Sequence, residues 1–384
     1  MHRIRTWLQA WWPGSEAGRE IVETLLWTRV GLLLAGWVAL ALLPWQYLSP
    51  TFNTSSSPWI LMWVRWDGIW YTQIAQHGYW TQALAFFPLY PLLIAAGHLI
   101  FRLGYDASAV FVANVSLLLF VFTLYHLVRE TFDDTLARRA VWLALIFPSA
   151  FFLSAAYTES LFLWLSTATF LALKRRRYVA AGIFGMLATL TRNEGLFLAL
   201  AFFVVYYQHF GWRWRWQILG VLPIGLGLAA FMTYQWIDFG TPLAFMQAQA
   251  YWGRHITWPV LGFFWAVRTI WNGSPLQPSA VLSMIDLLAA ISAGLLWVYG
   301  LKHRLPWDWL VYWAVLWLVD VSAPVASGES PLLSMSRLVL VIFPMFVTLA
   351  MLAERESWRR FLGFVLPMLQ VVFFVTFATW HWIA

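Results

Sequence analysis

Apolar segments close to the length of a membrane-crossing helix recur along almost the whole 384-residue chain. A hydrocarbon core about 30 Å thick requires roughly 20 helical residues. The segments lie at 24–43, 85–101, 107–128, 139–156, 158–173, 178–191, 195–208, 216–236, 278–300, 308–326, 338–353 and 361–383. They are continuously apolar rather than alternating, and lipid cannot satisfy open backbone groups, so helices are favoured over a barrel. The sequence therefore predicts an all-α polytopic membrane protein.

The charged residues of the chain are few and grouped. The chain is 61% hydrophobic and only 11% charged, which lies outside the range of soluble domains. Its net charge of +7 comes from short basic clusters between apolar segments, a pattern that does not suggest a nucleic-acid partner. There is no cysteine, which rules out disulfides and thiolate metal sites and leaves the redox compartment open.

The basic clusters indicate which loops face the cytoplasm, because such loops are enriched in lysine and arginine. These clusters are Arg3/Arg5, residues 174–177, Arg213/Arg215, Lys302/Arg304 and Arg355/Arg359/Arg360. The N-terminus is then cytoplasmic. The opposite side receives two large loops, 44–84 and 237–277, together with residues 191–195, residues 327–337 and the C-terminus.

The count of crossings contains one conflict. Four apolar segments lie between the external loop and the basic cluster at 174–177, where an odd number is required. We place the surplus in 85–128 as a re-entrant or interfacial segment, which gives about eleven crossings in total. The first segment is expected to be an uncleaved helix, although residues 39–41 could pass for a signal-peptidase site. No linker divides the chain, so residues 1–384 are expected to form one membrane domain.

One acidic residue, Asp67, lies in the aromatic stretch RWDGIWY of the first large loop. Tryptophan and tyrosine side chains provide a semi-apolar environment at the depth of the lipid headgroups, where burying an unpaired carboxylate costs free energy. A charge kept in such a place is a functional candidate. The alternative is a helix N-cap or a solvated loop carboxylate.

Two further charged residues stand beside breaks between apolar segments. Glu159 is at a predicted helix start, where it would complement the helix dipole and Thr158 could act as the cap; a purely structural role is therefore a serious alternative. Arg192 separates two short segments at the external face. Helix N-terminal amides beside a guanidinium suit a phosphate, and the alternative is a structural pair with Glu194.

Arg254 and Arg337 are both external in this topology. Each has the alternative of reaching toward lipid phosphates, which is the default for an interfacial arginine. Three external arginines together with one or two buried acids nevertheless describe a site for an anionic lipid and a reacting hydroxyl.

Three neighbouring residues complete the set of substrate-binding candidates. Tyr71 and Asn193 adjoin Asp67 and Arg192 in the sequence. His77 follows Asp67 among aromatic residues, where packing or hydrogen bonding is the alternative to a ligand role. No second histidine or carboxylate stands at a convincing metal spacing, so we predict no metal and no cofactor.

Six collinear stretches carry a family resemblance. They are RWDGIWYTQIAQHGY, AFFPLYPLL, FPSAFFLSAAYTESLF, TLTRNEG, FGTPLAFMQAQAYWGR and SMSRLVLVIFPMF. From about residue 24 to residue 353 the chain resembles the GPI mannosyltransferase 2 (PIG-V type) family, in its prokaryotic branch. The resemblance implies a class C glycosyltransferase bundle with re-entrant or interfacial helices in its external loops. It also implies the plasma membrane of a prokaryote, with an extracytoplasmic active site.

The same resemblance implies a reaction. The class takes a sugar from a polyprenyl or dolichyl phosphate carrier, and an acid of the first external loop, here Asp67, is taken as the base. Transfer with inversion needs one carboxylate, whereas glycoside hydrolysis usually uses a pair. Arg192 and Arg337, then Arg254, are the candidates for the carrier phosphate.

The sugar and the acceptor are less defined. Mannose is implied by the family alone. The acceptor is an unidentified glycolipid, glycan or protein, and a GPI precursor is not expected because the chain lacks large lumenal insertions. Two other functions stay open: a polyprenyl-lipid or glycolipid transporter, and a non-catalytic subunit of a glycosyltransferase complex.

Overall fold

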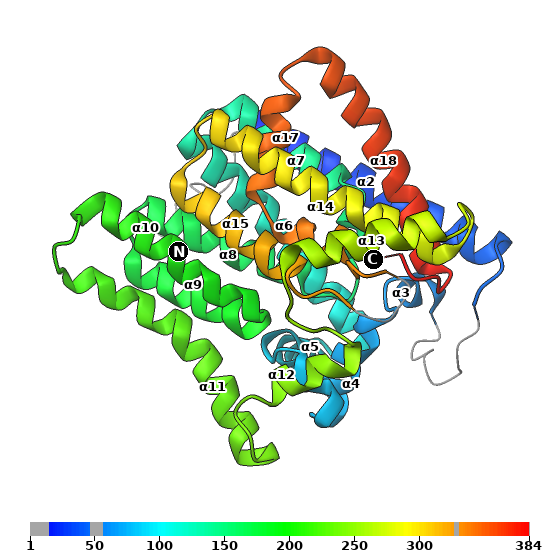
Figure 1. Cartoon of the computed structure of the whole chain (residues 1–384), viewed down its shortest axis with the longest axis horizontal. Helices are drawn as coiled ribbons and strands as arrows, with labels where there is room; N and C mark the ends of the chain where they lie inside the picture. Colours follow the sequence, from blue (N-terminus) through cyan, green and yellow to red (C-terminus); the bar gives the residue numbers. More distant parts are fainter. Residues whose placement is uncertain (1–14, 47–56, 326–329, 384) are drawn as a thin grey trace.

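The computed structural model describes residues 15–46, 57–325 and 330–383. Within these ranges the regular structure is helical apart from one isolated antiparallel bridge between Arg254 and Val325 (Figure 1). This confirms the predicted all-α class. Arg3, Arg5 and part of the loop 44–84 lie outside the described residues.

Helices of three length classes build the molecule. The longest are α2 (Ser15–Leu42), α6 (Tyr105–Thr131), α11 (Leu222–Phe239), α14 (Pro278–Lys302) and α18 (Glu356–Ala378). Intermediate helices are α5 (Leu89–Phe101), α7 (Asp134–Ile146), α8 (Glu159–Lys174), α9 (Tyr178–Thr191), α10 (Leu198–Phe210), α13 (Pro259–Asn272) and α15 (Trp307–Val321). The short ones are α3 (Pro58–Leu61), α4 (Asp67–His77), α12 (Ala244–Gln249), α16 (Met335–Leu338) and α17 (Pro344–Leu352).

Short 3₁₀ turns join several of these helices. They are η2 (Thr81–Ala85), η3 (Ala150–Leu153), η4 (Asn193–Phe197), η5 (Trp216–Val221), η6 (Ala250–Trp252) and η7 (Val339–Val341). In Figure 1, α9, α10 and α11 occupy one side of the bundle, α2, α7 and α18 occupy the other, and α6 and α8 lie between them.

Five helices of the described residues are long and apolar enough to cross a membrane, each within or overlapping a predicted segment. A sixth span is obtained if 335–341 and 344–352, which bend by 91°, are counted together. The expectation of about eleven crossings is therefore not confirmed, because six of the other predicted segments form helices of only 13 to 16 residues. Segment 139–156 leaves the helix after Ile146, just before the Phe147–Pro148 step, where a helix is disfavoured.

The lengths of α5 and α6 bear on the surplus segment in 85–128. The 27 residues of α6 extend about 40 Å, whereas the 13 residues of α5 extend only about 20 Å. Of these two, α5 is the helix too short to cross. A second break, at Pro344, was not expected from the sequence.

The irregular stretch that follows α7 is held by an arginine from the first helix. Arg29 of α2 donates to the carbonyl oxygens of Leu145 at 3.1 Å and Ala150 at 3.0 Å, and to Ser154 Oγ at 3.1 Å. These bonds satisfy backbone groups that a helix end leaves open in an apolar setting. The stretch can therefore leave helical geometry and lead directly into Glu159.

Two helices approach closely where glycine removes the side chain. A Cβ on Gly182 of α9 would lie 2.0 Å from the carbonyl oxygen of Gly220 in η5. Small residues at such crossings are the usual means of close helix packing in membranes. This contact fixes α9, which ends at Thr191 just before Arg192, against the segment leading into α11.

Substituting Gly182→Ala should lower the thermal unfolding midpoint of the purified protein, because overpacking costs about 1–3 kcal/mol. The matched control is Gly225→Ala in α11, where a Cβ meets nothing within 4 Å. That control should be neutral or stabilising, since alanine is the better helix former by about 1 kcal/mol. Equal midpoints for the two variants would contradict the close contact.

Candidate active site

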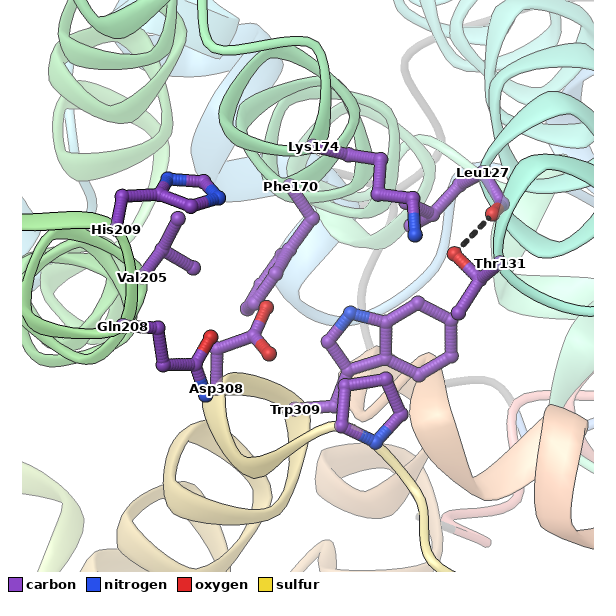
Figure 2. Close-up of a pocket in the computed structure, with 10 residues that line it drawn as sticks. Leu127, Thr131, Phe170, Lys174, Val205, Gln208, His209, Asp308 and Trp309 are labelled. Atoms are coloured by element: carbon purple, nitrogen blue, oxygen red, sulfur yellow. Dashed lines mark hydrogen bonds between the residues drawn. The ribbon is translucent and has the colours of Figure 1, made fainter.

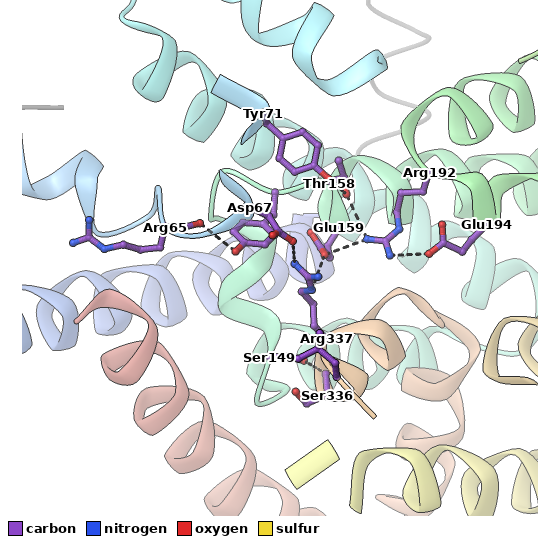
Figure 3. A network of polar contacts seen from close by, with 12 residues as sticks. Arg65, Asp67, Tyr71, Ser149, Thr158, Glu159, Arg192, Glu194, Ser336 and Arg337 are labelled. Carbon is purple, nitrogen blue, oxygen red and sulfur yellow. Dashed lines mark hydrogen bonds and ion pairs between the residues drawn. The ribbon is translucent and has the colours of Figure 1, made fainter. Parts of the chain in front are cut away.

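Five ionisable side chains form a continuous array at a set of helix ends (Figure 3). Arg337 Nη1 lies 2.6 Å from Asp67 Oδ2, and Arg337 Nε lies 3.7 Å from Glu159 Oε1, which is too long for a hydrogen bond. Arg192 Nη1 lies 3.2 Å from the same Glu159 oxygen, and Arg192 Nη2 lies 2.8 Å from Glu194 Oε1. Acidic and basic side chains therefore alternate along the array, and each acidic side chain has a cationic neighbour.

Asp67 is the first residue of α4, and the backbone before it is unusual. Trp66 adopts a positive φ of 50°, which is uncommon for a bulky residue. Its ring packs edge-on against Trp380 and Trp382. The Tyr157 hydroxyl donates to the Arg65 carbonyl at 3.2 Å. These contacts fix the direction in which the Asp67 side chain leaves the backbone, toward Arg337.

Glu159 begins α8 and is only 1% exposed. The expected cap by Thr158 is wrong: Thr158 occupies the N-cap position, but its side chain makes no capping hydrogen bond. Its hydroxyl instead lies 3.4 Å from Arg192 Nη1 and 3.5 Å from the Tyr71 hydroxyl. Glu159 is therefore a member of the charged array as well as an acid at a helix start.

Arg192 lies in an extended conformation between α9 and η4. Its predicted alternative, a pair with Glu194, is present, and Glu159 is a second partner. Burial lowers the pKa of Arg192, but the attraction of Glu194 and Glu159 outweighs it and raises the pKa above its ordinary value. Burial raises the pKa of Glu194, but Arg192 outweighs this and holds the pKa below its ordinary value. Both groups are charged at neutral pH.

Arg254 is placed differently from the other two arginines. Its Nη2 donates to the Leu333 carbonyl at 3.0 Å, and no carboxylate of the described residues lies within ion-pair distance of it. Burial lowers its pKa. Arg254 is therefore a cation at the site whose charge is not matched by a direct acidic partner in the part of the chain that the structure describes.

A cavity of about 350 Å³ connects these groups. Its charged lining residues are Asp67, Glu159, Arg192, Glu194, Arg254, Asp320 and Arg337. Tyr71 and Asn193 also line it. His77 does not: it is exposed at the other end of α4, ten residues and about 15 Å of helix away from Asp67. The structure therefore unites seven of the eight residues predicted from the sequence.

The rest of the cavity wall is largely apolar. Its apolar members are Ala85, Phe86, Phe87, Phe245, Met246, Ile256, Val319, Ala323, Leu333, Leu338 and Trp382, and its uncharged polar members are Thr191, Gln249, His255 and Ser334. Tyr71 packs edge-on against Phe86, with ring centroids 5.0 Å apart. A pocket with a few convergent charges in an apolar wall is the usual form of a small-molecule site. Among the described residues, no group of three or more histidines or acids is placed to hold a metal ion.

Two acids near the site are not among the residues predicted from the sequence. Asp320, in the last turn of α15, lines the cavity and makes no ion pair with any described residue. Asp286 is buried in α14 behind the segment that carries Arg337. Each interrupts an apolar segment, and a charge in such a segment is itself a functional signal.

A second cavity, of about 170 Å³, lies at the other end of α15 (Figure 2). Lys174, His209 and Asp308 are among its lining residues. Asp308 and Asp320 stand at opposite ends of α15, about 18 Å apart along the helix. Lys174 belongs to the basic cluster 174–177. This separation is consistent with the predicted orientation, in which that cluster and the site face opposite sides of the membrane.

A bundle of membrane-length helices with a charged cavity at its helix ends defines the class: a polytopic membrane protein with a candidate active site. Residues 27–252 match the family model described as mannosyltransferase (PIG-V), which is more than half of the chain. The chain belongs to this family of mannosyltransferases. The match includes Asp67, Tyr71, Glu159, Arg192 and Asn193 and ends before Arg254 and Arg337.

Individual relatives match over shorter stretches. The GPI alpha-1,6-mannosyltransferase 2 of Cricetulus griseus is 31% identical over 201 residues, 49% of this chain and 40% of the relative. The GPI mannosyltransferase 2 of Schizosaccharomyces pombe is 32% identical over 152 residues, 37% of this chain and 32% of the relative. The matches thus span less than half the length of these curated relatives.

Among solved structures, an oligosaccharyltransferase of Archaeoglobus fulgidus is similar with a TM-score of 0.46 and 13% identity, over 92% of this chain and 55% of that chain. The class C bundle stays a prediction.

Arg192→Met should lower the free energy of unfolding by about 3–5 kcal/mol, because it leaves buried acids without compensation. Adding Glu194→Leu should recover part of this loss, since Glu194 has no other basic partner among the described residues, whereas Glu159 still has Arg337 at 3.7 Å. Unfolding of the purified variants in detergent measures both effects. A double variant no more stable than Arg192→Met alone would show that the array is not an electrostatic unit.

Proposed function

We propose that this chain transfers a mannosyl group from a polyprenyl or dolichyl phosphate carrier to an acceptor hydroxyl, with inversion, on the extracytoplasmic side of a prokaryotic plasma membrane. Family membership supports the reaction type. The observation that carries the proposal is one cavity that holds both an oriented carboxylate, Asp67, and an arginine, Arg254, that makes no ion pair with the described residues, although Asp320 of the same cavity attracts it. The acceptor is a glycolipid, glycan or protein.

Asp67 is the proposed base. Its Oδ2 is engaged by Arg337, whereas its Oδ1 accepts no hydrogen bond from the described residues. As the acceptor oxygen attacks the anomeric carbon, Oδ1 takes the hydroxyl proton. The bond from the anomeric carbon to the phosphate oxygen breaks, and the lipid phosphate leaves with the electron pair. Arg337 acts by holding the carboxylate in one orientation.

Glu159 is not proposed as a nucleophile that would give retention. It is 1% exposed, and its Oε1 is shared between Arg192 and Arg337. A nucleophile needs direct access to the anomeric carbon. The geometry supports a single displacement with one base.

Formal charges favour Arg254 as the first contact of the carrier phosphate. Asp67, Glu159 and Glu194 carry three negative charges, and Arg192 and Arg337 carry two positive ones, which leaves one excess negative charge in the array. A further anion placed directly on the array is repelled. This reverses the order expected from the sequence, in which Arg192 and Arg337 came first.

The apolar wall supports a lipid-linked donor. Phe86, Phe87, Phe245 and Met246 line the same cavity as the charged groups. Such side chains give an isoprenoid chain an apolar surface comparable to the lipid tails that it leaves, so the chain can enter the cavity without facing a polar wall. The phosphate and sugar would then lie at the charged end of the cavity.

Asp67→Asn should reduce kcat for mannosyl transfer by at least about 100-fold, the usual contribution of a positioned base, while carrier binding changes little. Radiolabelled polyprenyl-phosphate mannose and membrane glycolipid acceptors provide the assay. The matched control is Asp238→Asn at the exposed end of α11, which does not line the cavity and should be fully active.

The same pair of variants separates the other two functions. Undiminished lipid movement by Asp67→Asn, with no transfer by the unsubstituted chain, would favour a transporter. Absence of transfer by the purified chain, restored only by a partner, would favour a non-catalytic subunit. Full transferase activity of Asp67→Asn would exclude Asp67 as the base.

Arg254→Gln should weaken binding of polyprenyl phosphate by roughly 10- to 100-fold, because a charge-assisted hydrogen bond contributes about 1.5–3 kcal/mol. The control is Arg268→Gln, an exposed arginine of α13 that does not line the cavity. Binding of a fluorescent polyprenyl phosphate measures both. Unchanged affinity in Arg254→Gln would mean that Arg192 or Arg337, and not Arg254, binds the phosphate.

A further inference from the structure

Asp286 is a carboxylate within α14, one of the helices long enough to cross a membrane, and it is 3% exposed. Its Oδ2 accepts from Ser330 Oγ at 2.8 Å, and its Oδ1 accepts from the Ser336 amide at 3.0 Å. It makes no ion pair with any described residue. An acid in such a helix is expensive and is usually kept for a function.

The segment that Asp286 holds, residues 330–337, leads to the active-site array. Both backbone polar groups of Ser336 are hydrogen-bonded. Its amide donates to Asp286, and its carbonyl accepts from Ser149 Oγ at 2.8 Å. Ser334 adopts a positive φ of 66°, so the segment cannot be replaced by a simple helical turn. The next residue after Ser336 is Arg337, whose guanidinium meets Asp67 at 2.6 Å (Figure 3).

The same segment also reaches the second arginine of the cavity. The Leu333 carbonyl, between the two residues that Asp286 binds, accepts from Arg254 Nη2 at 3.0 Å. Val325, just before the segment, pairs with Arg254 in the isolated bridge, and its amide donates to the Pro331 carbonyl at 2.9 Å. One segment thus sets the positions of Arg337 and Arg254 together.

We propose that Asp286 is a positioning residue of the active site: through Ser330 and Ser336 it fixes the segment that presents Arg337 to Asp67 and seats Arg254. Asp286 does not line the cavity and touches no reacting group, so it acts through geometry and not through its charge. This inference rests on the proposed function. It concerns a part of the chain beyond the family match, which ends at residue 252.

Small displacements are sufficient for a large effect. A misplacement of about 1 Å at a reacting group can reduce the rate on the order of 100-fold. Loss of the Asp286 contacts would leave the buried Ser336 amide without its partner, so the segment would shift to satisfy it. Arg337 would then no longer orient the Asp67 carboxylate.

Three substitutions separate geometry from charge. Asp286→Asn keeps an oxygen for the Ser336 amide, and its NH₂ can donate to the Ser330 hydroxyl, so kcat should stay within about 3-fold of the unsubstituted chain. Asp286→Glu keeps the charge but adds a methylene, which displaces the segment, and kcat should fall about 10-fold or more. Asp286→Ala removes both contacts, and its kcat should fall at least as far as that of Asp286→Glu.

The order of the Asn and Glu variants decides the question even if Asp286→Ala fails to fold. Activity of Asp286→Glu at or above that of Asp286→Asn would overturn the proposal, because it would mean that the charge matters and the geometry does not. The matched control is Asp308→Ala. Asp308 is another buried acid, and it lies at the end of α15 remote from Asp320 and the active-site cavity. That variant should retain its activity per folded molecule; a loss equal to that of Asp286→Ala would indicate a general effect of removing buried acids.

A readout independent of mannosyl transfer keeps the two proposals distinguishable. The chain has no cysteine, so Leu333→Cys provides a single reactive thiol on the segment. Its labelling rate with a water-soluble maleimide should rise several-fold on adding Asp286→Glu and stay unchanged on adding Asp286→Asn. Equal rates in both backgrounds would overturn the positioning role. A difference in labelling without any transferase activity would retain it and reject the proposed function.

Discussion

The ion pair between Arg337 and Asp67 is the contact on which the rest of the charged array depends. It joins residues 270 positions apart in the chain and closes an array in which acids and arginines alternate. Burying any one of these charges alone would be costly, and removing one partner leaves another uncompensated. The array is therefore both a structural junction of distant helix ends and the means by which a carboxylate is kept oriented beside an apolar cavity.

Compensation within the array has a chemical consequence. Because Arg192 and Arg337 are already matched by acids, they are suited to holding Asp67 and Glu159 rather than to receiving a new anion. Arg254 has no such match among the described residues and faces the same cavity. Proton acceptance and phosphate recognition are thus assigned to different residues of one cavity, and the segment 330–337 connects them.

Local sequence patterns predicted the helices and the charged residues better than they predicted how these meet. Continuous apolarity correctly predicted an all-helical membrane protein, but it did not show that the stretch after the Phe147–Pro148 break is held by Arg29, whose carbonyl partners lie 116 and 121 residues along the chain. An acid among tryptophans and an arginine at a break marked Asp67 and Arg192. His77 was predicted because it follows Asp67 closely in the sequence, but the two residues lie at opposite ends of the 11-residue helix α4. Asp286 needed the fold, since its partners lie 44 and 50 residues away.

The most direct test is an experimental structure of the protein with a hydrolysis-resistant phosphonate analogue of polyprenyl-phosphate mannose. The proposed mechanism predicts the phosphonate oxygens at hydrogen-bond distance, about 3 Å, from the Arg254 guanidinium, with the anomeric carbon facing Asp67 Oδ1 and the Arg337–Asp67 pair intact. A phosphonate bound by Arg192 and Arg337 in place of their acids, or a sugar on the side of the cavity remote from Asp67, would contradict it.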